Sequence, residues 1–544
     1  MRRLARLLLL SAVGAVALFV LPAVVAADHN TRESDNLRAL GHSPHPATFL
    51  GQVPALREVN SDLAFWRNLT FNGNYDGFRI IRNRPFNPQE INWTHCNGDQ
   101  GDIVVWGDIL VRAWNSPAPA NDPATPVQEN RFCDGQPVPV GFEGMHIFDI
   151  SDLSDPKLVG EVELSARPQA DMPGCGTHTL TLVPDLDDDR VLIYNQTSGG
   201  NPALPPGLTE CDWLDIIQVP LDDPGAASFL HREPLEGGHA AHDSGVILGD
   251  VNKLAVASGH MSNVFDIGAN ATPGGSPEDP EPLFTIEEPG VCSVPDDPAN
   301  PNPQRPCNGN WHSAGFTWDG EVIILGWEPG GGSQPECEAS DPAVKKSAFF
   351  YDADTGHKLG QWTLPRPQIG LAEATPAAGA ENCTIHNYNT VPTRNGSYIL
   401  VSGNYQAGTW VTDFSDPANA KTIGYADPAP LPQVMAPATP TVPAHLVNEL
   451  GGAWSSYWYN GIIYESEITK GLNLFRYTGK ETRGAVRLRH LNPQTQEFTI
   501  NGKKGDDDGD DDDDRGDDDH GRGAKDHGDK NRGDHGDGDR DDDD

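Results

Sequence analysis

The sequence predicts an all-β protein, a β-propeller of about seven blades followed by a disordered acidic tail. A weak repeat of about 40 to 70 residues runs through the body of the chain, and each unit holds several short strand-like runs. The chain contains 58 glycines and 47 prolines, which suits short strands joined by turns. No amphipathic helical stretch stands out. One large β domain is therefore favoured over several small domains.

Each repeat contains an apolar alternating strand that runs into a turn. In the clearest case Gly144 to Ile150 leads into a Ser-Asp turn and Pro156, which is turn chemistry. Seven such strands are predicted to close the blades, at residues 77–81, 144–150, 214–219, 263–267, 348–352, 409–414 and 471–476. Opening strands precede them, within residues 62–71, 102–113, 177–194, 241–257, 313–327, 388–401 and 455–465. Loop insertions are expected at 115–140, 268–310 and 426–450.

The stretch Phe148-Asp149-Ile150-Ser151-Asp152, with Pro156 and Val159-Gly160 after it, resembles the LVIVD repeat. Longer stretches resemble secreted actinobacterial LVIVD-repeat proteins, among them Gly176-Thr177-His178-Thr179 and Trp311-His312-Ser313-Ala314. The resemblance covers about residues 60 to 500. It implies a propeller and brings no well-defined activity with it. The first blade departs from the pattern, because Arg82-Asn83-Arg84-Pro85 replaces the usual Asp-Ile-Ser turn.

The N-terminus predicts export. Basic Arg2, Arg3 and Arg6 precede an apolar run from Leu7 to Val25, and small residues follow it. A permanent membrane anchor is the alternative, but the small residues at the end of the apolar run fit a cleavage site and favour removal of the segment. The predicted parts are a signal peptide at 1–27, a leader segment at 28–59, the propeller at 60–500 and the tail at 501–544. The expected location is extracellular or at the cell surface, without stable membrane insertion after cleavage.

The charge is acidic and uneven. The formal net charge is −41, and Asp dominates the segment Asp506–Asp544, which cannot bury apolar surface and is predicted to be disordered. This tail either solvates the protein or binds Ca²⁺ weakly through its many carboxylates. No basic patch offers itself to phosphates, which argues against nucleic-acid binding.

The eight cysteines are predicted to form structural disulfides, because an exported chain with an even number of cysteines favours pairing. Eight cysteines allow 105 connectivities, and pairing in chain order is the hypothesis adopted. The predicted bonds are Cys96–Cys133, Cys175–Cys211, Cys292–Cys307 and Cys337–Cys383.

Histidines recur near the predicted blade openings. They are His95, His178, His239, His242, His312 and His386. The first strand of a propeller blade lines the central channel, so side chains at equivalent positions converge near the axis. Imidazoles there are suited to copper, zinc or iron, similar to the axial histidines of selenium-binding-type propeller oxidases. The candidate metal ligands are His178, His242, His312, His386 and Glu465, with Glu467 nearby. The alternative is structural: each His bonds a backbone carbonyl of the next blade.

The sequence offers no Gly-x-Ser-x-Gly elbow, no P-loop and no dinucleotide-binding glycine motif. The function predicted first is therefore an extracellular binding or scaffold protein without catalytic activity. Its partner would be an extracellular protein or glycan. The alternative is a metal-dependent oxidoreductase or hydrolase that uses the axial histidines.

The chain ends are predicted to pair and close the circle of blades, because an open circle leaves an exposed sheet edge. The run Asp62 to Ile81 is short for a full blade. A returning strand at Ala485–Leu488 is expected to supply the missing edge of the first or the last blade.

Overall fold

The computed structural model describes residues 32–45, 59–98, 100–118, 131–167, 170–197, 211–237, 240–268, 273–292, 309–329, 337, 341–366, 381–428, 433–436, 445–448 and 451–500. These residues belong to one unit, Met1–Lys503. The predicted signal peptide, the acidic tail, His239 and Cys307 lie outside the described residues. No helix among the described residues is long and apolar enough to cross a membrane.

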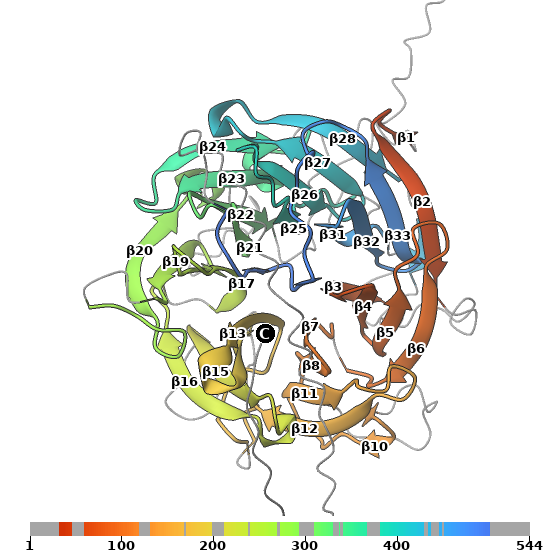
Figure 1. The fold of residues 1–544 in the computed structure, drawn as a ribbon, viewed down its shortest axis with the longest axis vertical. Helices are drawn as coiled ribbons and strands as arrows, with labels where there is room; N and C mark the ends of the chain where they lie inside the picture. The colour runs from red at the N-terminus through yellow and green to blue at the C-terminus, as the bar shows by residue number, and fades with distance from the viewer. Residues whose placement is uncertain are drawn as a thin grey trace, which may run out of the picture. The chain divides into compact units, whose positions relative to one another are not determined.

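The described chain is all-β, as predicted, and most of its strands belong to seven antiparallel groups of four hydrogen-bonded strands. Figure 1 shows how these groups follow one another along the chain. The first sheet is β3 (Asn60–Trp66), β4 (Leu69–Asn74), β5 (Gly77–Arg82) and β6 (Gln89–His95). The second is β7 (Ile103–Trp106), β8 (Ile109–Trp114), β11 (Gly144–Asp149) and β12 (Lys157–Glu163). The third is β13 (Thr179–Asp185), β14 (Arg190–Gln196), β15 (Trp213–Pro220) and β16 (Ser228–Pro234). The fourth is β17 (Ala241–Ile247), β18 (Lys253–Ser258), β19 (Met261–Asp266) and β20 (Glu281–Glu287).

The fifth sheet is β21 (Asn310–Phe316), β22 (Val322–Glu328), β23 (Ser347–Asp352) and β24 (Lys358–Thr363). The sixth is β25 (Asn387–Thr390), β26 (Ile399–Gly403), β27 (Thr409–Asp413) and β28 (Lys421–Asp427). The seventh is β31 (Ala453–Tyr459), β32 (Ile462–Glu467), β33 (Gly471–Tyr477) and β2 (Leu37–Pro44). A parallel pairing at Asn387 and Ser455 joins the sixth and seventh sheets into one nine-stranded sheet.

The remaining elements are short. They are β1 (Arg32–Glu33), β9 (Phe132–Cys133), β10 (Gln136–Pro137), β29 (Gln433–Ala436), β30 (His445–Asn448), β34 (His490–Leu491), β35 (Thr495–Gln496), the four-residue helix α1 (Pro289–Cys292), and 3-10 turns at Leu186–Asp188, Pro224–Ala226, Ala343–Lys346 and Pro417–Asn419.

The apolar strands expected to close each repeat are the third strands of their sheets, so that part of the prediction is wrong. A fourth strand lies outside each of them. The fourth strand of the second sheet, β12, reads Lys-Leu-Val-Gly-Glu-Val-Glu and is partly exposed along most of its length. Outer strands face solvent on one side and need few apolar residues, so their sequence resembles a polar loop.

Packing between neighbouring sheets supplies the cores. The second strands are covered on both faces, and β14 is buried at every residue. Phe78 and Phe148, from the first and second sheets, pack edge to face with ring centroids 5.0 Å apart. Burying one such side chain contributes roughly 1.5–3 kcal/mol.

The first strands of successive sheets contact one another in chain order, from β3 through β7, β13, β17, β21 and β25 to β31, and β31 contacts β3 again. In Figure 1 these strands lie innermost, and β6, β12, β16, β20, β24 and β2 lie outermost. Side chains at the start of each first strand therefore face a common central space.

An N-terminal strand completes the last sheet. β2 pairs antiparallel with β33, so the segment expected to be a leader is part of the fold. The first sheet needs no returning strand because β6 is its fourth strand. The prediction of a strand at Ala485–Leu488 is wrong: in this described segment only a single bridge, between Ala485 and Thr393, occurs.

The C-terminal part of the described chain crosses the inner strands instead. Asn492 exchanges two 2.9 Å hydrogen bonds with the backbone of Val105, in the second sheet. Thr495 donates to the Leu182 carbonyl at 2.7 Å, and β35 pairs parallel with β17. Ile500 N–H donates to the Trp318 carbonyl at 2.6 Å. Residues 492–500 thus join the second, third, fourth and fifth sheets.

Three of the predicted disulfides are present: Cys96–Cys133, Cys175–Cys211 and Cys337–Cys383. The fourth predicted bond, Cys292–Cys307, lies outside the described residues because of Cys307. Three disulfides are compatible with an oxidising, extracellular environment.

Candidate functional site

Four histidines stand at one repeated position, where the chain enters the first strand of the third, fourth, fifth and sixth sheets. They are His178, His242, His312 and His386. The strand register shifts at His242 and at His312, where each histidine is a bulged residue between paired neighbours. A bulge re-aims its side chain out of the normal alternation of a strand. The local backbone therefore turns these imidazoles toward the central space.

The four imidazoles form a continuous row. Ring centroids are 4.4 Å apart for His178 and His242, 4.2 Å for His242 and His312, and 4.1 Å for His312 and His386. The Nε2 atoms of His178 and His242 lie 3.1 Å apart. The repeat of one residue over four neighbouring sheets produces this row, because equivalent positions of neighbouring sheets are adjacent in space.

Glu328, the last residue of β22, faces this row. One carboxylate oxygen lies 3.9 Å from the Nε2 atoms of both His242 and His312, and the other lies 3.9 Å from Nε2 of His386. Tyr405 donates its hydroxyl hydrogen to Glu328 Oε1 at 2.9 Å. The Tyr405 ring also packs on His386, with centroids 4.2 Å apart. Three imidazole nitrogens thus face one carboxylate.

Burial sets the charge states of the cluster. It lowers the pKa of His178 and of His386 to about 3, and it lowers the pKa of His242 and His312 well below the usual range. The imidazoles are therefore neutral at pH 7, and a neutral imidazole presents a lone pair on one nitrogen. Burial raises the pKa of Glu328 to about 7, partly offset by the Tyr405 hydrogen bond.

The orientation of His386 shows which nitrogen is free. Its Nδ1 lies 2.5 Å from the carbonyl oxygen of Trp454, in the seventh sheet. This contact fixes the proton on Nδ1 and leaves the Nε2 lone pair facing Glu328. The expected structural role, a bond to a carbonyl of the next sheet, is therefore compatible with metal binding through Nε2.

The cluster lies in a cavity of about 570 Å³. Besides the four histidines and Glu328, the wall contains aromatic side chains and amides. These are Tyr75, Tyr405, Trp454, Gln100, Asn115, Asn310, Asn382, Asn387 and Gln406. No lysine or arginine is among the described residues of the wall. The cavity is large enough for a small molecule and is suited to an uncharged or cationic one.

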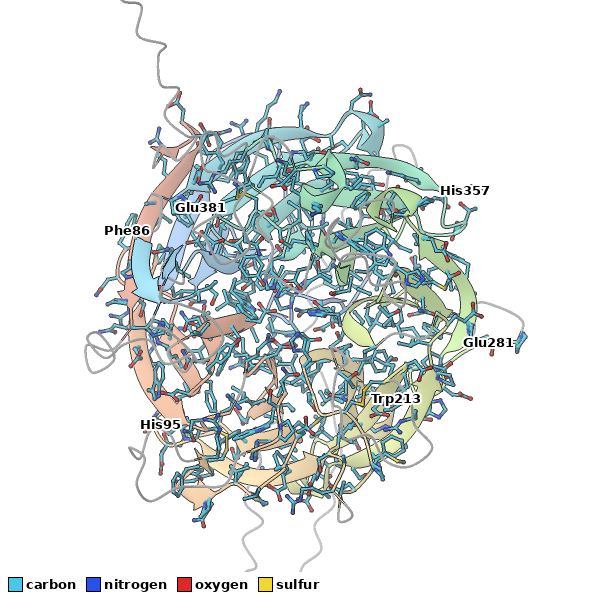
Figure 2. All side chains as sticks on the ribbon, turned by 180° about the vertical axis from the view of Figure 1, so that it is seen from behind. Phe86, His95, Trp213, Glu281, His357 and Glu381 are labelled. Carbon is cyan, nitrogen blue, oxygen red and sulfur yellow. A yellow bond between two sulfur atoms is a disulfide. The ribbon has the colours of Figure 1, made fainter. Side chains whose placement is uncertain are left out.

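The other candidate ligands lie elsewhere. Glu465 is buried in the seventh sheet, where its two oxygens accept hydrogen bonds from Thr409 at 2.6 Å and Asn473 at 2.7 Å. Glu467 accepts a hydrogen bond from the backbone N–H of Gly452 at 2.9 Å. His95 ends the outer strand β6 and is exposed, as Figure 2 shows at the periphery. The structure does not bring these three side chains to the histidine row.

Sequence reasoning missed Glu328 and Tyr405. Glu328 follows the apolar run Val322 to Trp327, and an acid at the end of such a strand is a usable signal because it is buried only with a partner. Tyr405 has a positive φ of 46°, an uncommon conformation for a residue other than glycine. No sequence pattern marks it.

No protein-family model matches this chain, and a search of curated proteins gave no match either.

Proposed function

We propose that His178, His242, His312 and His386 bind one transition-metal ion, and that the protein is a metal-dependent enzyme acting on a small molecule in the central cavity. The row of four neutral imidazoles carries the proposal, and within it ligand atoms of His242, His312 and Glu328 all lie within 4.8 Å of one another. Two nitrogens that each lie about 2.0–2.1 Å from one ion, at an angle near 100°, are about 3.1 Å apart. The His178–His242 separation of 3.1 Å matches that geometry.

The ligand number favours an oxidoreductase over a hydrolase. Zinc in structural sites takes four protein ligands and is then closed, whereas catalytic zinc keeps three protein ligands and an open position. Iron and copper accept imidazole ligands and larger coordination numbers. Four histidines beside a cavity therefore suit iron or copper, with open positions toward the cavity, and such an ion supplies electron transfer or oxygen chemistry.

The chain's own residues have distinct roles in this proposal. The four histidines hold the ion, and the Trp454 carbonyl orients His386 through its Nδ1. Glu328 lies 3.9 Å from three of the Nε2 atoms, where its carboxylate balances positive charge. Tyr405 positions Glu328 by a hydrogen bond of 2.9 Å. The aromatic and amide side chains of the wall orient the substrate.

We further infer that the seven groups of four strands form a seven-bladed β-propeller of the LVIVD-repeat type, and that the protein is exported. The cyclic contacts of the first strands support the propeller. The repeat motifs support the family, and the disulfides agree with export. A pure binding or scaffold role, the function expected first, leaves the buried histidine row and its cavity without a purpose.

The test is to measure the metal content of the full-length protein by elemental mass spectrometry. The protein is purified without chelators. We expect about one iron or copper ion per chain in the native protein. His312→Gln should reduce the bound metal at least tenfold, since losing a ligand costs more than losing an outer-sphere partner. The matched control is His95→Gln, an exposed histidine that should leave the metal content unchanged. Equal metal content in both variants, or no transition metal in the native protein, would refute the proposal.

A further inference from the structure

A second group of metal-ligating side chains lies at the outer rim of the fold, between the third and fourth sheets. His231 and Glu233 belong to β16, the outer strand of the third sheet. Asp279 belongs to the segment that leads into β20, the outer strand of the fourth sheet. Glu281, the first residue of β20, is labelled at the periphery in Figure 2. This rim cluster of His231, Glu233 and Asp279 shares no residue with the wall of the central cavity.

The register of β16 turns two of these side chains toward the fourth sheet. Beyond a register shift in the ladder with β15, His231 pairs with Ile216 and Glu233 pairs with Leu214. Directly opposed residues of an antiparallel pair have side chains on the same face. Ile216 and Leu214 belong to one apolar cluster with Phe265 of the fourth sheet. Residues two apart on a strand also share a face, so His231 and Glu233 form a chelating pair on the side of the fourth sheet.

Asp279 reaches this pair from a segment that is fastened to the third sheet. Tyr194 donates its hydroxyl hydrogen to the Pro277 carbonyl at 2.8 Å. Arg190 forms an ion pair with Glu278. Both contacts come from β14, and they hold the next residue, Asp279, beside β16.

The separations of the ligand atoms suit a single ion. His231 Nε2 lies 3.1 Å from Glu233 Oε2 and 3.6 Å from Asp279 Oδ1. One ligand atom from each of the three residues lies within 4.8 Å of the other two. Zinc binds imidazole nitrogen and carboxylate oxygen at about 2.0–2.2 Å, so two ligands at the tetrahedral angle are about 3.3 Å apart. The Asp279 side chain is 80% exposed, so packing does not prevent it from closing on an ion.

The positive side chains of this region are engaged elsewhere. Arg190 forms ion pairs with three other acids, and Arg232 pairs with Asp215. In the part of the chain that the structure describes, no lysine or arginine forms an ion pair with Glu233 or Asp279. The imidazole of His231 is therefore the one basic group paired with these two carboxylates among the described residues.

Negative charge is in excess around Glu233. Burial raises the pKa of the Glu233 carboxyl, and the nearby Asp279 and Glu281 carboxylates raise it further, against the opposing effect of His231. A divalent cation bound between the carboxylates replaces their mutual repulsion by attraction to the ion. The charges of the rim cluster therefore favour a cation.

We propose that His231, Glu233 and Asp279 bind a zinc ion between the third and fourth sheets. One imidazole nitrogen and two carboxylate oxygens are ligands that zinc accepts, whereas Ca²⁺ takes oxygen ligands. Water fills the fourth position. The ion fastens the segment before β20 to β16 and so strengthens the contact between two outer strands. The site is independent of the proposed function, because it uses no residue of the histidine row.

Chemical modification of His231 by diethyl pyrocarbonate tests the site on the full-length chain. The reagent acylates the lone pair of a neutral imidazole. Zinc on Nε2 occupies that lone pair and leaves the proton on Nδ1, so a bound ion protects the residue. Peptide mass spectrometry reports modification of His231 alone, so zinc bound by the acidic tail or by the histidine row does not contribute. The exposed His357 is the internal control.

Zn²⁺ at about ten times its dissociation constant should slow the modification of His231 about tenfold and leave that of His357 unchanged. Mg²⁺ should give no protection. Asp279→Asn and Glu233→Gln should each raise the Zn²⁺ concentration needed for half-protection about tenfold or more. The matched control is Asp187→Asn, an exposed acid, which should behave like the native chain.

Three outcomes overturn the proposal: equal modification of His231 with and without Zn²⁺, equal protection of His231 and His357, or native protection in Asp279→Asn. Circular dichroism checks the folding of each variant, and the exposure of Asp279 makes its amide variant the safer of the two. His312→Gln should lose the transition metal of the proposed function and keep the protection of His231 by Zn²⁺. The rim site and the histidine row therefore fail separately.

Discussion

Leu37, near the N-terminus, and Tyr477, at the end of the last sheet, are backbone partners in the same antiparallel ladder. Both side chains are buried in one hydrophobic cluster. The two ends of the fold are thus joined by strand pairing, which leaves β33 without an open edge.

This closure depends on the burial of Leu37. Leu37→Ala should lower the free energy of unfolding by about 2–4 kcal/mol, because it removes a fully buried leucine. Arg38→Ala, the exposed neighbour in the same strand, should change it by less than about 0.5 kcal/mol. Urea unfolding of both variants measures the difference. If the two variants match, β2 does not hold the fold closed.

Deleting residues 28–45 should have a larger effect. The buried guanidinium of Arg79 donates to Ser43 Oγ at 2.8 Å and to the Pro44 carbonyl at 2.9 Å, so the deletion also removes partners of a buried charge. We expect aggregation or a loss beyond that of Leu37→Ala, since breaking a buried charged contact costs about 3–5 kcal/mol. Light scattering and thermal melts check this. A deletion variant as stable and monomeric as the native chain would contradict it.

Truncation tests the role of residues 488–500, the segment that crosses the inner strands of the sheets. A chain that ends after Arg487 lacks buried Leu488 and Leu491 and the Gln494 contact to Asp62. We expect it to melt at a lower temperature and to aggregate, whereas a chain that ends after Lys504 should behave like the full chain. Equal melting temperatures and solubility for the two truncations would show that the segment is dispensable.

A pH prediction follows from Glu465. Burial raises its pKa from 4.5 to about 7, so the folded state holds its proton more tightly than the unfolded state does. Its contribution to stability is therefore full below about pH 4.5 and is lost as the pH rises through about 7. Relative to Glu465→Gln, the native protein should lose about 3 kcal/mol over this interval. Urea unfolding at several pH values measures the difference, and parallel pH curves would disprove it.

The sequence by itself determined that the fold is all-β, and it marked the recurrent histidines. Alternating apolar strands and turn residues report local structure, so they predict the third strands. Pairing of the cysteines in chain order predicts the three described disulfides. The recurrence of His178, His242, His312 and His386 pointed to one spatial position, because a repeat maps equal sequence positions onto equal places.

Only the tertiary structure decided the rest. The outer strands are half-exposed and lack an apolar pattern, so the sequence does not predict them. For the same reason the sequence predicts a leader segment where β2 lies. Glu328, not Glu465, faces the imidazoles, because the carboxylate comes from the second strand of the fifth sheet and no repeat marks it. The partners of Asp62 are residues 457 and 494, about 400 positions away. Such contacts depend on how the sheets close, and that is a property of packing between distant segments.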